Sequence, residues 1–218
     1  GKNITCGQTR AGGIYNGDGA SLNLVDSTVS DNLSGWTAGG IYSFFNTTTN
    51  IIRSTVSDNV ALDVAGGLRT LGNVTIENSS VSGNTSTAWH GGAMFSTDGV
   101  VTIVNSTIVG NNAPPGTTGG LMVATYGTPV ELTLHNSIIA DNGSYSCQIE
   151  GNPATAVLTS LGNNVFTDGS CNPISSDQTV AATGVDVLAD NGGPTLTHAL
   201  LAGSPAIDAA DVAVCPAT

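Results

Sequence analysis

Basic side chains are the scarcest feature of this sequence. Its 218 residues include four Lys and Arg against 16 Asp and Glu, which gives a formal net charge of −12. A surface that neutralises nucleic-acid phosphates needs a cluster of cations, so nucleic-acid binding is excluded as a function class. The acidic surplus favours solubility and attracts divalent cations, but it does not identify a partner.

Long apolar runs and a starting methionine are also missing. No apolar run reaches the roughly 20 residues of a membrane-spanning helix, so we expect no membrane span in this chain. We expect the numbering to begin at a processed or excised N-terminus, because no signal peptide opens the chain. With 29 glycines and only 9% charged residues, the composition argues against a helical protein, and 39% apolar residues argue against disorder.

Cysteine is rare, and its spacing excludes the usual zinc and redox motifs. The four cysteines are Cys6, Cys147, Cys171 and Cys215, and they form no Cys-x-x-Cys pair. Disulfides in an oxidising, extracytoplasmic compartment are their expected use. Cys147 and Cys171 bracket one irregular segment, and a bridge between them would contribute about 3 kcal/mol of stability.

What the sequence does contain is a repeat. The segment Ser27-Thr28-Val29-Ser30-Asp31-Asn32 returns four times, with its first serine at Ser54, Ser79, Ser106 and Ser137. Upstream of each copy lie a glycine pair and a short segment in which apolar and polar residues alternate, such as Val74-Thr75-Ile76. A fixed period of this size is typical of solenoid proteins, and alternation of period two is typical of strands with one buried face.

These repeats predict an all-β fold, a right-handed single-stranded parallel β-helix of about 5–7 coils. Each strand would bond to its copy in the next coil about 4.8 Å away, because one repeat alone cannot bury its apolar face. Residues 1–145 are predicted to hold the regular coils. Residues 146–218 are predicted to form irregular last coils and a C-terminal tail packed on the same solenoid.

Two sets of residues are assigned structural roles at the turns of each coil. Glycine pairs are expected at corners where φ becomes positive or where backbones approach closely; they are Gly12 and Gly13, Gly39 and Gly40, Gly66 and Gly67, Gly91 and Gly92, and Gly119 and Gly120. A ladder of stacked asparagine side chains is expected at the end of each serine segment; its members are Asn32, Asn59, Asn84, Asn111 and Asn142.

The C-terminal part carries a resemblance to a known family. The run from Asp190 to Ala209, which follows Leu161-Gly162-Asn163-Asn164 and flanking cysteines, resembles the end of bacterial surface proteins of the "choice-of-anchor Q" type. The glycine and serine repeats are similar to those of polymorphic outer membrane proteins. This resemblance implies a right-handed β-helix on a secreted or cell-surface protein of bacterial type, and it implies no reaction.

One departure from that family concerns the remaining cysteines. Such proteins usually continue beyond the Cys-Pro-Ala-Thr segment to a partner cysteine, whereas this chain ends at Thr218. Cys6 and Cys215 would lie at opposite ends of a solenoid, too far apart for a bond within one straight molecule. A disulfide between successive molecules would suit them, and it suggests head-to-tail assembly into a filament or sheath, with a second copy as the partner.

We predict no catalytic residue and no metal site. The leading hypothesis is a non-catalytic extracellular protein of structural or adhesin type. The alternatives are a module that binds cell-surface or extracellular glycans and, less favoured, a polysaccharide lyase or hydrolase. Glycan binding would use aromatic residues near loops, namely Trp36, Tyr42, Phe44, Phe45, Trp89 and Tyr126. The alternative to no metal site is a calcium site at Asp186, Asp190, Asp208 and Asp211, which are otherwise ordinary acidic residues in turns. Arg69 is expected to be a solvated strand residue.

Overall fold

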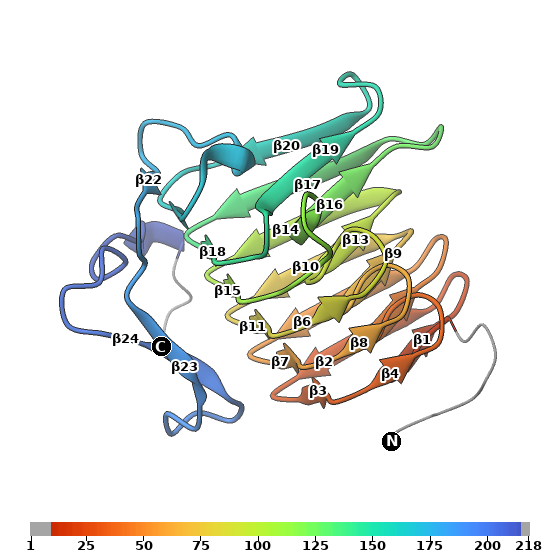
Figure 1. Ribbon diagram of the computed structural model, residues 1–218, viewed down its shortest axis with the longest axis horizontal. Coiled ribbons are helices and arrows are strands. Elements are labelled where there is room, and N and C mark those ends of the chain that lie inside the picture. The colour runs from red at the N-terminus through yellow and green to blue at the C-terminus, as the bar shows by residue number, and fades with distance from the viewer. Residues whose placement is uncertain (1–9, 215–218) are drawn as a thin grey trace.

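The computed structural model describes residues 10–214, and they form a parallel β-solenoid of about six turns (Figure 1). Almost every strand pairs in register with the strand one repeat before and after it. The expected all-β solenoid is therefore confirmed. Cys6 and Cys215 lie outside the described residues.

Three long sheets run the length of the solenoid, and we name them A, B and C in the order in which each coil meets them. Sheet A contains β1 (Ile14–Asn16), β5 (Ile41–Ser43), β9 (Leu68–Thr70), β13 (Met94–Ser96), β16 (Thr118–Ala124) and β19 (Tyr145–Glu150). Sheet B contains β2 (Ser21–Val25), β6 (Thr48–Ile52), β10 (Asn73–Glu77), β14 (Gly99–Val104), β17 (Val130–His135) and β20 (Ala156–Ser160).

The serine segments supply sheet C, which contains β3 (Thr28–Ser30), β7 (Thr55–Ser57), β11 (Ser80–Ser82), β15 (Thr107–Val109), β18 (Ile138–Ala140), β21 (Val165–Phe166) and β22 (Gln178–Thr179). A short sheet D follows it in the first three coils, with β4 (Leu33–Ser34), β8 (Val60–Ala61) and β12 (Thr85–Ser86). β19, β20 and β21 add a sixth coil to sheets A, B and C, in the segment where the last coils are predicted.

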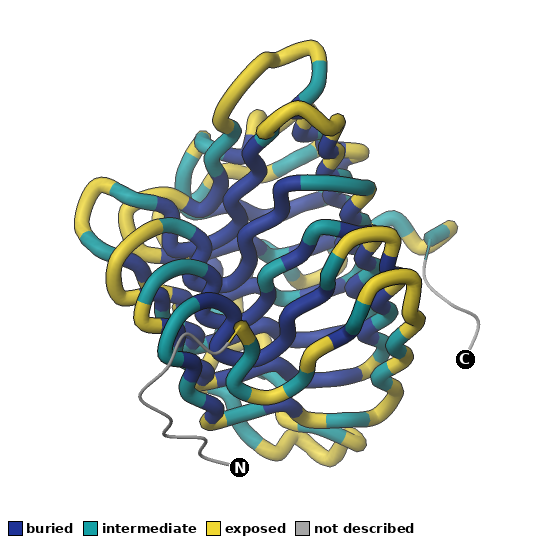
Figure 2. Tube along the Cα trace, turned by 90° about the vertical axis from the view of Figure 1, so that its right-hand side faces the viewer, coloured by how far each residue is buried: buried dark blue, intermediate teal, exposed yellow. Residues whose placement is uncertain are grey.

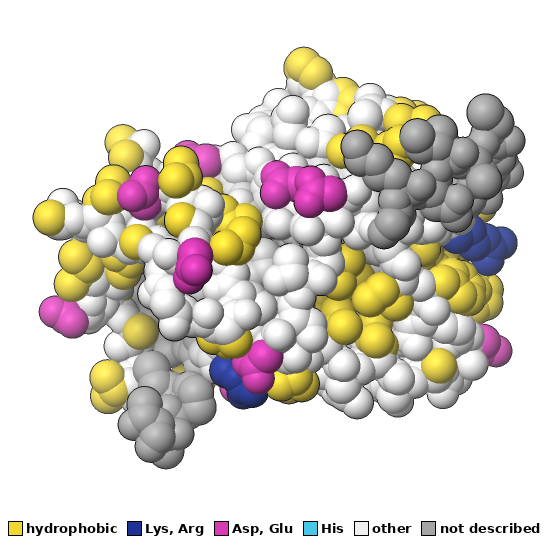
Figure 3. Space-filling view, turned by 90° about the horizontal axis from the view of Figure 1, so that it is seen from below, with side chains coloured by type: hydrophobic (Ala, Val, Ile, Leu, Met, Phe, Trp, Pro, Cys, Tyr) yellow, Lys and Arg dark blue, Asp and Glu magenta, His cyan; other side chains and the backbone are white. Residues whose placement is uncertain are grey.

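The core runs along the axis of the solenoid (Figure 2). Alternate residues of each strand point inward, and fully buried members include Ile51, Ile76, Ile103 and Leu134 in sheet B. Burying one such side chain contributes about 1.5–3 kcal/mol. The equivalent residues of the first coil, Ile14, Leu22 and Leu24, are only partly buried. Figure 3 views that end of the molecule, where charged side chains are sparse.

Two columns of turns use the left-handed backbone conformation. The residue before each serine segment has φ between 46° and 57°; these residues are Asp26, Arg53, Asn78, Asn105, Asn136 and Asn163. A second column precedes the asparagine ladder and contains Asp31, Asp58, Gly83, Gly110 and Asp141. Asp, Asn and Gly tolerate this conformation best, which explains why they recur. Arg53 is the exception, and it forms a bidentate pair with Asp26 of the previous coil at 2.8 Å.

The glycine pairs serve close approach more than positive φ. A Cβ atom on Gly39 would lie 2.6 Å from backbone atoms of Val60, so this glycine lets two turns of the chain touch, as do Gly12, Gly66, Gly92 and Gly119. Among the five pairs only Gly91 has a positive φ. The fourth pair was also aligned wrongly from the sequence, because Met94 pairs with Leu68 and Gly92 therefore takes the place of Gly66.

The C-terminal tail runs along the side of the solenoid (Figure 1, blue). Its antiparallel hairpin, β23 (Val185–Ala189) with β24 (Thr197–Leu200), lies against sheet C, where Thr55 donates a hydrogen bond to the Leu196 carbonyl at 2.7 Å. The 3₁₀ helix η2 (Val212–Val214) follows the column of left-handed asparagines, and Asn136 bonds both the carbonyl and the amide of Asp211. The described tail therefore covers a side of the rod and not its end.

Candidate functional site

The outer face of sheet A carries a column of large side chains. The middle residue of each strand points away from the core, and the register aligns them in one row: Tyr15, Tyr42, Arg69, Phe95, Met122 and Gln148. Tyr15 and Tyr42 stack with ring centroids 5.5 Å apart. Most of this row is apolar, although it lies outside the solenoid core.

Loops that leave the end of each coil form a wall beside this row. They stack through backbone bonds, since the Asp63 amide donates to the Trp36 carbonyl at 2.9 Å and the Trp89 amide donates to the Asp63 carbonyl at 3.1 Å. Trp36, Asp63 and Trp89 therefore come from three successive coils and lie along one edge. Figure 2 shows such exposed loops on both sides of the buried strands.

Two adjoining hollows lie between the row and the loops, each of about 290 Å³. Asp63, Val64, Phe95 and Tyr126 line both hollows, so the two form one continuous depression, which we call the aromatic groove. Trp36, Tyr42 and Arg69 line one end of it, and Trp89, His90 and Glu150 line the other. The Trp89 side chain is 59% exposed and that of Tyr126 is 74% exposed.

Exposed aromatic rings of this size are unusual unless they have a partner. Each presents a flat apolar face together with a polar N–H or O–H group. Clustered around a hollow with a few polar groups, they have the character of a ligand site. Burial raises the pKa of Tyr42, whose hydroxyl stays protonated at neutral pH and acts there as a neutral hydrogen-bonding group.

Arg69 is not the solvated residue that its sequence position suggested. Its guanidinium carbon lies 4.5 Å from the centroid of the Phe95 ring. Nη1 donates to the carbonyls of Thr70 and Phe95, and Nη2 donates to Thr97 Oγ1. Desolvation by burial lowers the pKa of Arg69 to about 10, so the guanidinium stays charged at neutral pH.

The structure brings together four of the six aromatic residues predicted for glycan binding: Trp36, Tyr42, Trp89 and Tyr126. Phe44 and Phe45 pack beside the groove, where Phe44 contacts the Tyr42 ring. The sequence analysis missed Phe95. The register of the fourth coil pairs Phe95 with Arg69 and so places it in the outer row of sheet A.

The predicted asparagine ladder residues lie in a buried row beside the glycine pairs. From Asn59 onward, each Oδ1 accepts from the backbone N and from Nδ2 of the asparagine one coil before, at 2.9–3.1 Å. A second ladder escaped the sequence analysis. The first serine of each segment accepts a hydrogen bond from the serine amide of the previous coil at 3.0–3.2 Å. Both ladders accept hydrogen bonds from backbone amides at the corners of the coils, and they therefore have structural roles.

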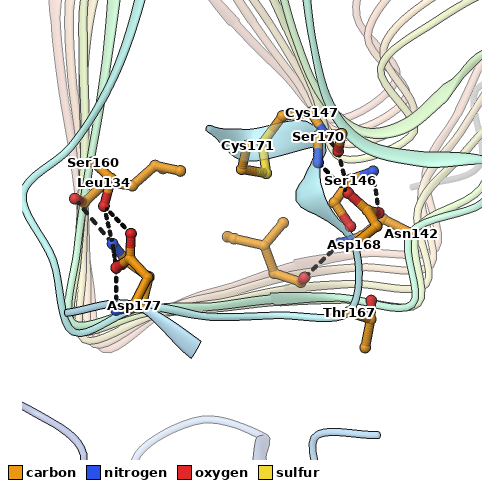
Figure 4. The surroundings of a disulfide bond; sticks show 12 residues. Leu134, Asn142, Ser146, Cys147, Ser160, Thr167, Asp168, Ser170, Cys171 and Asp177 are labelled. Atoms are coloured by element: carbon orange, nitrogen blue, oxygen red, sulfur yellow. Dashed lines mark hydrogen bonds between the residues drawn. A yellow bond between two sulfur atoms is a disulfide. The ribbon is translucent and has the colours of Figure 1, made fainter. Parts of the chain in front are cut away.

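The last coil is closed by a disulfide between Cys147 and Cys171 (Figure 4). Both cysteines are buried, and Cys171 ends the 3₁₀ helix η1 (Gly169–Cys171). Asp168 begins this helix, and its carboxylate accepts from the amides of Ser146 and Ser170. Burial alone would raise the pKa of Asp168, but hydrogen bonds from Ser170 and Ser146 outweigh it and hold the pKa below its usual value.

Acidic side chains do not gather into a metal site in residues 10–214, where no three His, Cys, Asp or Glu side chains lie close enough to hold an ion. The candidates for calcium bond instead to nearby backbone: Asp190 accepts from the Gly192 amide and Asp211 from the Ala213 amide. Over the same described range, no helix has the length and apolar character needed to cross a membrane.

Comparison with known proteins gives one match. A family model described as "Right handed beta helix region" matches residues 12–198. No curated protein and no solved structure matches the chain. The matched range includes every residue of the aromatic groove.

Proposed function

Because the chain belongs to the right-handed β-helix family, we propose that it is a non-catalytic extracellular module of adhesin type that binds glycans in the aromatic groove. The fold is consistent with surface proteins and with carbohydrate-interacting proteins. The buried disulfide supports an oxidising compartment outside the cytoplasm. The family resemblance of the tail supports a cell surface of bacterial type.

The observation that carries this proposal is the pair Trp89 and Tyr126 at the rim of one hollow. Both rings are more than half exposed, and both line a space that also contains Asp63 and Glu150. A sugar ring presents apolar C–H faces together with hydroxyl groups at its edge. Aromatic platforms next to carboxylate acceptors match both parts of such a ligand.

A glycan array followed by calorimetric titration of the best hit tests the proposal. Replacing Trp89 or Tyr126 by alanine is expected to weaken binding about 10-fold each, because a stacking contact of this kind contributes about 1.4 kcal/mol. Tyr145→Ala is the matched control, since Tyr145 is 46% exposed and does not line the groove. An empty array, or equal losses in all three variants, would contradict glycan binding in the groove.

A lyase or hydrolase remains the competing proposal, since β-helix domains occur in enzymes and in non-enzymes. We expect no depolymerisation of acidic or neutral polysaccharides, with or without added calcium. The assay is the release of reducing ends or unsaturated products over a day at high protein concentration. Turnover that disappears in an Asp63→Asn or Glu150→Gln variant would contradict the non-catalytic proposal and show that the groove is a catalytic site.

Head-to-tail assembly is a second proposal, and one observation favours it. Ile14, Leu22 and Leu24 of the first coil are partly exposed, so that end has apolar surface to bury. The opposite end counts against stacking of strands end to end, since Phe166 and Cys171 are fully buried there. Non-reducing electrophoresis tests the disulfide-linked form. A ladder that collapses with reductant would support it, and monomer with every thiol paired would refute it.

A further inference from the structure

Arg69 lies at the middle of the row that floors the aromatic groove. Its neighbours in register are Tyr42 in one coil and Phe95 in the next. The surrounding loops enclose most of the side chain, and its guanidinium lines the hollow together with Trp36 and Tyr126. The floor of the groove therefore carries a positive charge among aromatic side chains.

This charge has no acidic partner within 4 Å among residues 10–214. Within residues 10–214 the ion pair of an arginine with a carboxylate is that of Arg53 with Asp26, on another face. The three acceptors of Arg69 are two carbonyls and a hydroxyl, all uncharged. Enclosing a charge without an opposite charge is costly, and a ligand that supplies a negative group would recover part of that cost.

The unused hydrogen-bond donors of Arg69 point to the shape of that group. A guanidinium has five N–H donors, and the protein provides two acceptors for Nη1 and one for Nη2. The Nε hydrogen and the second Nη2 hydrogen have no acceptor among the described residues. Nε and Nη2 are also the two nitrogens through which Arg53 holds the Asp26 carboxylate at 2.8 Å. This edge of a guanidinium fits a carboxylate with two parallel hydrogen bonds.

The charges elsewhere in the groove limit how acidic the ligand is. Asp63 borders both hollows and Glu150 lines the far one, so a carboxylate on every sugar would meet repulsion along the groove. Arg10 adds positive charge to the opposite end of the groove, because its guanidinium carbon lies 5.8 Å from the Trp36 ring centroid. The groove is thus cationic at one end and anionic at the other.

We infer that the aromatic groove selects an oligosaccharide in which one carboxylate-bearing sugar is joined to neutral sugars, with the carboxylate on Nε and Nη2 of Arg69. This inference rests on the proposed glycan binding and adds the class of glycan. The acidic sugar would be a terminal sialic acid or a terminal uronic acid. The neutral sugars would lie toward Trp89 and Tyr126.

Calorimetric titration with four probes tests it: 3′-sialyllactose, a glucuronic-acid-terminated disaccharide, lactose, and trigalacturonate. We expect at least one singly charged probe to bind about 10-fold tighter than lactose, since a charge-assisted bidentate contact is worth at least that factor. Trigalacturonate is expected to bind more weakly than that probe. The first two probes separate a sialic acid from a uronic acid as the source of the carboxylate.

Arg69→Gln is expected to reduce the ratio of the affinity for the charged probe to the affinity for lactose to less than about 3-fold. Arg69→Lys keeps the positive charge but cannot donate two parallel hydrogen bonds to one carboxylate. It is expected to keep only part of the preference for the charged probe over lactose. Arg53→Gln is the control, because it removes the same charge from another face. The thermal midpoint of each variant reports whether it is folded, and the wild-type comparison stands even if Arg69→Gln does not fold.

Equal or tighter binding of lactose by the wild-type protein would overturn the inference and leave glycan binding standing. Tightest binding of trigalacturonate would also overturn it, since the acidic end of the groove would then exclude nothing. Failure of all four probes and of the array would overturn the proposed function together with the inference. A preference that is lost equally in Arg53→Gln would show that net charge, and not Arg69, produces it.

Discussion

Replacing Asn59 by alanine removes a side chain that bonds to both neighbouring coils. Its Oδ1 accepts from the backbone N and the Nδ2 of Asn32, at 3.1 and 2.9 Å. Its Nδ2 donates to the Val29 carbonyl and to Asn84 Oδ1, both at 2.9 Å. Asn59 is fully buried, so water does not replace these contacts in the folded variant without opening the corner.

The magnitude follows from counting the groups left without a partner. The variant leaves two donors on Asn32 and weakens the pairing of the Val29 carbonyl, whereas Asn84 Oδ1 still accepts from the backbone N of residue 59. Each buried polar group left unpaired costs about 1–3 kcal/mol. We therefore expect a loss of about 4 kcal/mol in the free energy of unfolding, which for a chain of this size lowers Tm by about 8–16 °C.

Urea and thermal unfolding followed by circular dichroism measure this loss. Asn50→Ala is the matched control, because Asn50 is in the same coil and its Nδ2 also bonds an asparagine of the first coil, Asn23, at 2.7 Å. That bond is exposed, and we expect its loss to cost less than about 0.5 kcal/mol. If both variants lose the same free energy of unfolding, then burial does not determine how much the asparagine ladder stabilises the protein, and the reasoning fails.

Three further perturbations test other parts of the structure. Reducing the bridge between Cys147 and Cys171, which are 24 residues apart, is expected to lower stability by about 3 kcal/mol in urea unfolding with and without reductant. Gly39→Ala is expected to cost more than about 3 kcal/mol, because its Cβ would meet the backbone of Val60, whereas Gly169→Ala meets nothing within 4 Å and should be near neutral in the same assay. Hydrogen bonds lower the pKa of Asp168 in the folded protein, so its ionised carboxylate contributes to the free energy of unfolding. That contribution is fully present above the unfolded pKa of about 3.9 and is lost as pH falls through the folded pKa. Asp168→Asn should therefore flatten the pH dependence of unfolding below about pH 4.

The regular part of the fold was predictable because it repeats. The alternation around Ile51, Ile76 and Ile103 marks an inward column, and stacking equivalent residues is the one arrangement that buries all of them. The asparagines that end each serine segment follow the same logic. A buried amide whose neighbours one coil away are also amides finds its donors and acceptors in the stack.

The left-handed columns could have been read from the same repeats. Asp26, Asn78 and Asn105 precede the serine of each segment, and Asp or Asn in one fixed place is the signal of a left-handed turn. Arg53 concealed this signal, since arginine rarely adopts a positive φ. Its pairing with Asp26 appears only when the two coils are stacked.

The aromatic groove could not be read in this way. Its floor, with Tyr42, Arg69 and Phe95, belongs to the regular strands of sheet A, but its walls come from loops whose sequence differs from coil to coil. Whether a given loop folds over sheet A or away from it depends on contacts such as that between Asp63 and Trp36, which no period encodes.

The path of the tail was equally beyond the sequence. The hairpin of β23 and β24 docks on sheet C through contacts between residues far apart in the chain, such as the bond from Thr55 to Leu196, which are 141 residues apart. Such contacts depend on single side chains that do not repeat.

The sequence by itself determined the solenoid, its coils and its inward-facing columns, because a period repeated five times leaves the chain one way to bury its apolar faces. Only the tertiary structure decided what lies on the outside of the rod. The register of sheet A and the stacking of loops from separate coils set Arg69 among aromatic rings, without an acidic partner in the described part of the chain, and that juxtaposition exists only in three dimensions.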